Sequence, residues 1–220
     1  AVLHLAEPLT NVEPLPYSLF EPDKVGTSFN VVGYGTRNNE QDSGMRRTGT
    51  LTLRGTTGRV FELLFGSFQD FARIAPRILD LPRDLTGLQL AWETELVLDG
   101  YEAVTGGGPH DSTSCFGDSG GPLIQLKAGR PTVYGVTSWG YEAADQVCAF
   151  GGVDAVLGPA VVAFLQREIA CPLLPTAGTC DGNQLLRCVG ESGNVSLERI
   201  DCGARGGTCV IDAQGGASCG

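Results

Sequence analysis

The residues best suited to chemistry lie in one glycine-rich stretch, residues 114–122, with the sequence SCFGDSGGP. Ser119 follows an acid and stands among glycines, which adopt backbone conformations closed to other residues, so a sharp turn is expected. Such a turn can direct the amides of Gly117 and Ser119 to one point beside the Ser119 hydroxyl. Those amides would stabilise the oxyanion that forms when a serine attacks a carbonyl carbon. The alternative is an ordinary turn before a strand, which short Gly, Ser and Asp runs usually are.

Two further features favour the chemical interpretation. Ser138, Trp139 and Gly140 end an apolar run that begins at residue 132. Cys115 and Cys148 are the only cysteines before residue 171. Together with the CxGDSGGP pattern, these features resemble the chymotrypsin/trypsin-like serine endopeptidases. The resemblance implies an all-β fold, with the second antiparallel β-barrel of that family, one strand of the first barrel and a C-terminal helix.

The resemblance also implies roles for the residues around the turn. Ser119 would be the nucleophile, and the amides of Gly117 and Ser119 would form the oxyanion hole. Asp118 would be a structural acid that pairs with the amino terminus created by zymogen cleavage. Cys115 and Cys148 would form a disulfide that ties the nucleophile loop to the pocket wall.

Substrate binding follows from the same resemblance. The implied substrate-binding residues are Thr113, Ser114, Ser138, Trp139, Gly140 and Gly152. Trypsin holds arginine or lysine with an aspartate six residues before the nucleophile, and Thr113 stands at that place here. A neutral or apolar P1 residue is therefore expected. Asp154 lies close to the same wall in the sequence, so an alternative negative site keeps a basic preference open.

The base that would activate Ser119 is harder to find, because the chain contains two histidines, His4 and His110. A serine hydroxyl needs a base that a carboxylate orients. Residues 1–9 resemble the strand directly after the family's catalytic aspartate, which places the catalytic His and Asp upstream of this chain. His4 is then expected to face solvent or a barrel neighbour. His110, on a loop near the pocket, is most simply a loop residue without a catalytic role.

An α/β-hydrolase is a rival interpretation, since residues 117–121 also fit the G-x-S-x-G pattern of a nucleophile elbow. That fold places its histidine after the serine. No histidine follows Ser119, so the rival fails.

The net charge and the cysteine content indicate which partners and which compartment the protein has. A net charge of −10 over 220 residues argues against binding nucleic acid or an anionic membrane by bulk electrostatics. Of eight cysteines, six lie in the last 50 residues, which indicates an oxidising compartment. A metal cluster is less favoured, because no CxxC pair occurs. The chain has no signal peptide and begins without methionine, as a mature or truncated chain would. We expect an extracellular protein without a cofactor.

The periodicity of apolar residues predicts the elements around the site. Strands are expected at 27–35, 46–54, 122–126 and 132–139, after an extended, proline-rich segment at 8–27. Between them, residues 61–65 and 88–98 are interpreted as strands, and residues 68–75 as a helix that Pro76 interrupts. A helix over 155–170 should end a protease domain of residues 1–170.

The tail, residues 171–220, is interpreted as a small module held by three disulfides, because so short a segment buries little apolar surface. Six cysteines allow 15 pairings, and the sequence does not choose among them. The module is either a binding accessory or a stabilising appendage. Asn194, Val195 and Ser196 form an N-glycosylation pattern.

Two functions remain open. The first is a secreted serine endopeptidase that acts on a polypeptide substrate, with His and Asp on a missing or separate N-terminal segment. The alternative is a non-catalytic, protease-like binding protein with a Cys-rich interaction module.

Overall fold

The computed structural model describes residues 2, 5–7, 9–21, 25–37, 43–78, 84–142, 148–171, 174–190 and 196–220. They form two compact units, one of residues Glu13–Pro159 and one of Ala160–Gly220 together with Ala1–Val12. In these ranges no helix is long and apolar enough to cross a membrane.

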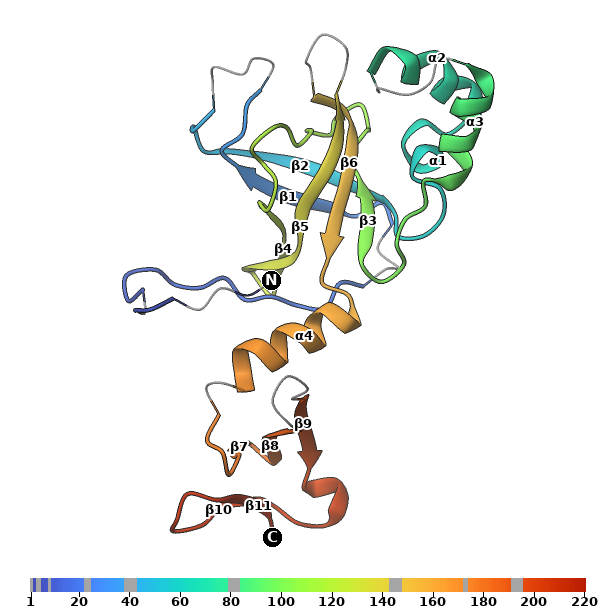
Figure 1. The fold of residues 1–220 in the computed structure, drawn as a ribbon. Helices are drawn as coiled ribbons and strands as arrows, with labels where there is room; N and C mark the ends of the chain where they lie inside the picture. The colour runs from blue at the N-terminus through green and yellow to red at the C-terminus, as the bar shows by residue number, and fades with distance from the viewer. Residues whose placement is uncertain are drawn as a thin grey trace. The chain divides into compact units, whose positions relative to one another are not determined.

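A closed antiparallel barrel is the centre of the first unit, with the strand order β1-β2-β3-β6-β5-β4 (Figure 1). Its strands are β1 (Ser28–Gly33), β2 (Arg47–Gly55), β3 (Glu102–Thr105), β4 (Pro122–Lys127), β5 (Arg130–Glu142) and β6 (Cys148–Val156). The barrel closes where β1 pairs with β4, Asn30 opposite Ile124. The predicted barrel and the four predicted strands are confirmed.

The barrel core follows from alternation along the strands. In β2, Leu51 and Leu53 are buried while Thr50 and Arg54 are not. Phe29 of β1 lies between the rings of Phe20 and Tyr134, at centroid distances of 5.8 and 6.0 Å. Phe20 comes from the proline-rich segment before β1, which runs along β5 as an extended chain. There the backbone amide of Ser18 donates to the carbonyl of Val133, and that of Val133 donates to Pro16.

The strand expected at residues 1–9 is not formed by residues 2, 5–7 and 9. A strand satisfies its backbone groups only by pairing with a neighbour. The alternation of apolar residues in this segment does not by itself provide a neighbouring strand.

Three helices lie between β2 and β3: α1 (Val60–Phe65), α2 (Phe68–Ile78) and α3 (Leu85–Thr94). The predicted helix at 68–75 is confirmed, and it continues past Pro76 to Ile78. The strands predicted at 61–65 and 88–98 are wrong. Leu88 and Trp92 are four residues apart, which places them on one helical face, and both are buried, whereas Leu90 between them is exposed. Asp84 starts α3 by accepting a hydrogen bond from the Gly87 amide at 2.8 Å.

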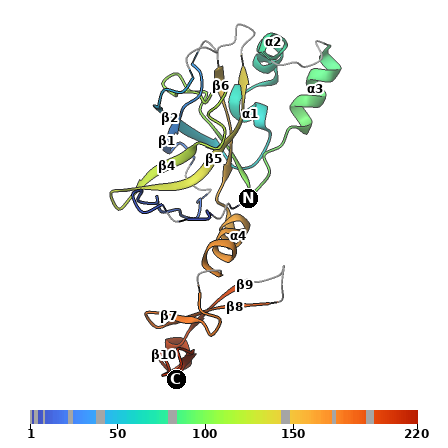
Figure 2. The same ribbon diagram turned by 60° about the vertical axis from the view of Figure 1, so that its left-hand side comes forward.

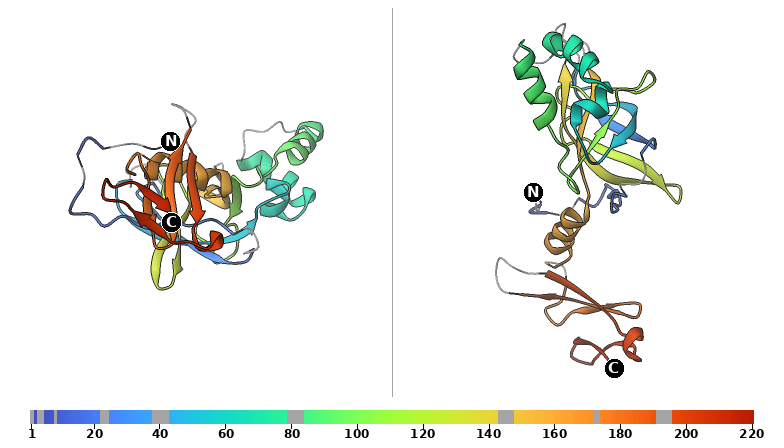
Figure 3. Two further views of the ribbon diagram at one scale, coloured as in Figure 1. Left: turned by 90° about the horizontal axis from the view of Figure 1, so that it is seen from below. Right: turned by 90° about the vertical axis from the view of Figure 1, so that its right-hand side faces the viewer.

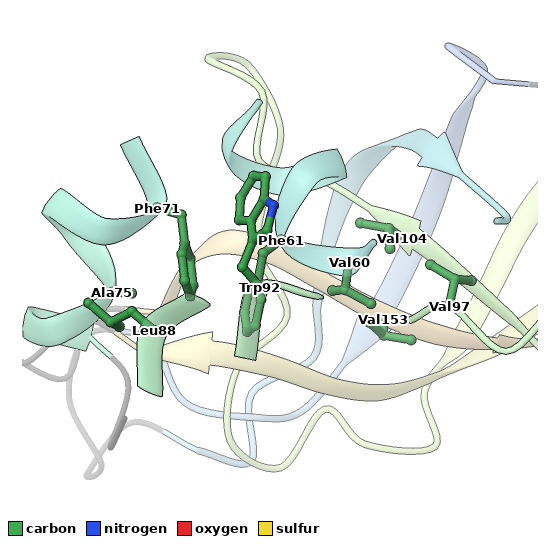
Figure 4. Close-up of a cluster of buried hydrophobic side chains, with 9 residues drawn as sticks. All are labelled: Val60, Phe61, Phe71, Ala75, Leu88, Trp92, Val97, Val104 and Val153. Carbon is green, nitrogen blue, oxygen red and sulfur yellow. The ribbon is translucent and has the colours of Figure 1, made fainter. Parts of the chain in front are cut away.

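These helices pack on the barrel through an aromatic and aliphatic cluster (Figure 4). The buried members are Val60, Phe61, Phe71, Ala75, Leu88, Trp92, Val97, Val104 and Val153. Phe71 stands at the centre, with ring centroids 4.4 Å from Phe61 and 5.4 Å from Trp92. Val104 and Val153 belong to β3 and β6, so the cluster joins the helices to the sheet. In Figure 2, α1 lies nearest to the barrel.

The second unit begins with α4 (Pro159–Ala170). The predicted helix is confirmed, and it starts at Pro159 because proline suits the first helical turn while the residues before it complete β6. The units divide just before Ala160, which groups α4 with the tail. The domain boundary at residue 170 stays a prediction.

The tail contains two small sheets (orange to red in Figure 3). One holds β7 (Thr179–Asp181), β8 (Gln184–Val189) and β9 (Ser196–Asp201), and the other holds β10 (Cys209–Ile211) and β11 (Ala217–Cys219). Disulfides join Cys171 to Cys188, Cys180 to Cys209 and Cys202 to Cys219. Among the described residues of the tail, the buried cluster consists of Leu185, Ile200 and Cys202. Asn194 lies outside the described residues.

Candidate active site

Residues 113–121, called the Ser119 turn below, form a tight bend that leads into β4. Gly117 and Gly120 have φ angles of +88° and +79°, which favour glycine. The Asp118 amide donates to the Cys115 carbonyl at 3.0 Å, and the Gly121 amide donates to the Asp118 carbonyl at 2.8 Å. These two bonds fold the bend on either side of Ser119, whose side chain is exposed.

Two backbone hydrogen bonds fasten the Ser119 turn to β5. The Gly120 amide donates to the Thr137 carbonyl at 2.8 Å, and the Thr137 amide donates to the Gly121 carbonyl at 2.9 Å. Thr137 directly precedes Ser138 and Trp139 in the chain. The nucleophile candidate and the proposed substrate strand are therefore held in a fixed register.

Asp118 is held by backbone amides. Its Oδ1 accepts from the Gly35 amide at 2.8 Å and its Oδ2 accepts from the Cys115 amide at 2.9 Å. A Cβ on Gly33 or Gly35 would collide with this carboxylate. The glycines at the end of β1 therefore make room for Asp118, and the sequence analysis did not assign them this role.

The amides of Gly117 and Ser119 donate no hydrogen bond within the part of the chain that the structure describes. Both residues are exposed. Backbone amides that remain unpaired beside a serine are the groups that an oxyanion needs. Among the described residues, the Gly117 and Ser119 amides are therefore available as hydrogen-bond donors.

A pocket of about 250 Å³, called the Ser119 pocket below, opens beside the turn. It is lined by Ser114, Cys115, Phe116, Gly117, Ser119, Thr137, Ser138, Trp139, Gly140 and Cys148. The structure thus brings together Ser119, Gly117 and the proposed substrate residues Ser114, Ser138, Trp139 and Gly140. Sequence reasoning missed Phe116 and Thr137, although Thr137 lies in the predicted strand directly before Ser138.

The other two proposed substrate residues do not line the Ser119 pocket. Gly152 lies opposite Gly140 in the β5–β6 ladder, so close that a Cβ on it would lie 2.6 Å from the Trp139 carbonyl oxygen. Thr113 lines a second hollow of about 280 Å³, called the Asp118 hollow below. Gly33, Gly35, Arg47 and Asp118 also line it.

The Cys115–Cys148 disulfide joins the Ser119 turn to the start of β6, with Cα atoms 5.4 Å apart. Both cysteines line the Ser119 pocket and the Asp118 hollow. The disulfide therefore contributes to the walls of both hollows and links the Ser119 turn to β6.

Asp154 of β6 is a buried acid, 2% exposed, and lies opposite Thr137 in the β5–β6 ladder. The Thr105 hydroxyl donates to its Oδ2 at 2.6 Å. Burial raises the pKa of the Asp154 carboxyl to about 6, although hydrogen bonds from the Thr105 and Thr137 side chains act to lower it.

Of the two histidines, the structure describes His110, and it does not face this site. His110 is exposed and lines neither hollow. Its loop is fixed by the neighbouring Asp111, which accepts from the Thr52 hydroxyl at 2.7 Å and the Gly108 amide at 2.9 Å. Partial burial acts to raise the pKa of Asp111, but these bonds and the Arg54 charge lower it. His4 lies outside the described residues. In the described ranges no three His, Cys, Asp or Glu residues gather as metal ligands would.

Residues 100–154, which run from before β3 through the Ser119 turn into β6, match the family model Trypsin. This part of the barrel is similar to the chymotrypsin/trypsin-like serine proteases. The chain is also similar to human atrial natriuretic peptide-converting enzyme, with 44% identity over 84 residues. This match covers 34% of the chain and 7% of that protein, so the chain spans a small part of its relative.

Proposed function

We propose that this chain carries the nucleophile half of a secreted serine endopeptidase. One observation carries the proposal: an exposed Ser119 stands on a turn whose Gly117 and Ser119 amides are unpaired among the described residues, beside a pocket. The match of residues 100–154 to the Trypsin model supports a polypeptide substrate.

In the proposed reaction, the Ser119 Oγ attacks the scissile carbonyl carbon and its proton passes to a histidine base. The carbonyl oxygen becomes an oxyanion that accepts hydrogen bonds from the Gly117 and Ser119 amides. The histidine then protonates the leaving amine, and water hydrolyses the acyl-enzyme. An N-terminal segment that is not part of this chain would supply the histidine and its aspartate.

The substrate would lie along β5, with its backbone paired to Ser138–Gly140 as an added strand. Its P1 side chain would enter the Ser119 pocket, and Trp139 would form one wall. Thr113 and Gly152 would act from behind this wall, since neither lines the pocket.

Asp118 would pair with the ammonium of a new amino terminus after proteolytic activation. The Asp118 hollow supports this role, because it leaves about 280 Å³ beside the carboxylate. The two amides that hold Asp118 are neutral donors, so an ammonium would add the opposite charge.

Secretion is supported by the four disulfides, which persist in oxidising compartments. The Cys-rich module would then be an accessory of an extracellular enzyme.

Labelling with a fluorophosphonate tests the nucleophile. We expect negligible labelling of the 220-residue chain alone, and strong labelling once an upstream segment with the His and Asp is added. Ser119→Ala should abolish labelling, whereas Ser218→Ala, in the tail, should not.

A non-catalytic binding protein is the second candidate, and one observation favours it. Among the described residues no histidine lines the Ser119 pocket. Absence of labelling in every polypeptide, with retained binding of an extended peptide along Ser138–Gly140, would establish this candidate and reject the enzyme.

A further inference from the structure

The 106–112 loop connects β3 to the Ser119 turn, and both of its ends are fastened to β2. The Gly106 amide donates to the Thr52 carbonyl at 2.9 Å. The Ser112 amide donates to the Thr50 carbonyl at 2.8 Å, and its hydroxyl accepts from the Thr50 amide at 3.2 Å. The ends of the loop therefore satisfy backbone groups on the edge of β2 beyond the point where β3 stops.

Asp111 is the centre of a network that closes the loop between these ends. Its Oδ1 accepts from the Thr52 hydroxyl at 2.7 Å, and its Oδ2 accepts from the Gly108 amide at 2.9 Å. Nη2 of Arg54 lies 3.4 Å from the same Oδ2, while its Nε donates to the Gly106 carbonyl at 2.7 Å. One planar guanidinium thus bridges the start and the end of the loop, which the single ammonium of a lysine does not do.

The Asp111–Arg54 pair is partly shielded from water. The side chain of Asp111 is 6% exposed and that of Arg54 is 33% exposed, so solvent screens this pair less than the fully exposed pairs of the surface. A Cβ on Gly108 would collide with both charged groups, which shows how closely the loop packs on them. The pair is therefore built into the loop.

The network fixes a segment that has little rigidity of its own. Residues 106–108 are three consecutive glycines, and the first two have φ angles of +75° and +79°. Glycine has more conformational freedom than any other residue, so such a run is costly to order. Asp111 and Arg54 supply the contacts that select one conformation.

The loop leads directly into a wall of the site. Thr113 follows it and lines the Asp118 hollow, and Ser114 lines both the Asp118 hollow and the Ser119 pocket. The nucleophile has separate attachments, because the backbone on its far side is bonded to Thr137. Release of the loop should therefore displace the wall at Ser114 and leave Ser119 in place.

We propose that Asp111 and Arg54 are positioning residues that hold Ser114 in the wall of the Ser119 pocket. Neither residue lines the pocket, so both act through the 106–112 loop. The inference rests on the proposed function for the role of the pocket in substrate binding, and it assigns the support of that pocket to two residues outside it. In the proposed enzyme, the pair governs how well a substrate binds and not how readily Ser119 reacts.

Amide hydrogen exchange, followed by NMR on the 220-residue chain, tests whether the pair holds the wall. Asp111→Ala removes the acceptor of three donors, so exchange of the Ser112 and Cys115 amides should become about tenfold faster or more. The Thr137 amide should exchange at an unchanged rate. Arg54→Lys keeps the charge and loses the fork, and it should accelerate the same two amides. Asp111→Asn keeps the shape of the side chain and should have a smaller effect than Asp111→Ala.

Cleavage of fluorescent casein, with the upstream segment added, separates positioning from a general loss of structure. Asp111→Ala should raise KM about tenfold, whereas kcat and the rate of fluorophosphonate labelling should stay within about twofold. A general loss of structure would lower kcat and labelling as well. Arg130→Gln is the matched control, because it removes an exposed ion pair with Glu13, and it should change neither KM nor exchange.

Unchanged exchange at Ser112 and Cys115 in Asp111→Ala, or faster exchange there without a rise in KM, would overturn the inference. If Asp111→Ala does not fold, Arg54→Lys provides the same measurements. If Ser119 reacts with fluorophosphonate in no polypeptide, the endopeptidase fails, and the exchange rates alone decide whether the pair holds the wall. If Ser119 reacts but KM does not respond, the positioning role fails alone.

Discussion

At the scale of single residues, the Ser119 turn depends on the missing side chains of Gly33 and Gly35. The Asp118 carboxylate occupies the space that a Cβ at either position would need. This contact connects the end of β1 to the acid next to Ser119. It makes the shape of the turn sensitive to a residue that is distant in sequence.

Gly35→Ala should therefore disturb the turn. The added Cβ would collide with the Asp118 carboxylate and the Phe116 carbonyl oxygen, and we expect a loss of about 1–3 kcal/mol in the free energy of unfolding. Urea denaturation measures it, and fluorophosphonate labelling of Ser119, with the upstream segment added, should slow in parallel. Gly26→Ala is the control, since its φ of +85° causes strain but no atom lies within 4 Å of the added Cβ. If the control slows labelling of Ser119 equally, the contact with Asp118 is not the cause.

Asp154 should make stability depend on pH. Its folded pKa of about 6 lies above the unfolded value of 3.8, so the folded state binds the proton more tightly between these values. The free energy of unfolding should therefore fall as pH rises from about 4 to 6, by roughly 3 kcal/mol from this group. Comparing urea denaturation of the wild-type chain with Asp154→Asn at pH 4 and pH 7 isolates the contribution. A stability difference between the two proteins that is the same at both pH values contradicts the assignment.

The sequence predicted only part of the candidate site. The chemistry of the turn is local, so Gly117, Asp118 and Ser119 were named from sequence. The support of the turn is not local. Thr137 of β5 bonds to Gly120 and Gly121 of the turn, and Gly35 reaches the turn from the loop after β1. The spacing of residues along the chain does not predict contacts between segments that are distant in sequence.

At the scale of elements, α1 to α3 back the pocket. Trp139, a wall of the Ser119 pocket, packs against the aromatic cluster of these helices. Phe150 of β6 joins the same packing, 5.4 Å from Phe65 between ring centroids. The insertion between β2 and β3 therefore supports the pocket wall from behind.

The elements predicted correctly are those whose apolar period is unambiguous. Leu51 and Leu53 alternate on one barrel face, and the helical spacing in α2 begins after Ser67, whose hydroxyl caps the amide of Asp70. In α3 the apolar residues alternate over a short run, which fits a strand as well as a helix. Burial of Leu88 and Trp92 against Phe71 decides for the helix. That contact belongs to tertiary structure, so the sequence pattern alone did not reveal it.

Trp92→Ala tests the support that these helices give to the pocket. Trp92 is 9% exposed and contacts Phe68 and Phe71, at centroid distances of 5.8 and 5.4 Å. Its truncation should lower the free energy of unfolding by about 3–5 kcal/mol. The remaining tryptophan, Trp139, should show red-shifted fluorescence as its packing loosens. Leu90→Ala, at a 62% exposed position on the same helix, should change stability by less than about 0.5 kcal/mol. An unshifted Trp139 spectrum in a folded Trp92→Ala chain would exclude the supporting role.

At the scale of the whole molecule, each unit has its own means of stability. The barrel unit buries two large apolar clusters, whereas the tail buries a small one that includes a disulfide cysteine. A segment of this kind depends on its crosslinks, because they restrict the unfolded chain. Crosslinks in the two units should therefore have separable effects.

Replacing both Cys202 and Cys219 with serine should unfold the tail and leave the barrel intact. The disulfide closes a loop with a sequence separation of 17, for which the stabilisation is about 3 kcal/mol, and the tail core has little else. Hydrogen exchange should show lost protection in β8 and β9, with unchanged protection in β4 and β5. Replacing Cys115 and Cys148 should have the opposite pattern, because that bridge forms a wall of the Ser119 pocket. If removal of the tail bridge lowers protection in β4 and β5 as much as removal of the barrel bridge does, the two units are energetically coupled.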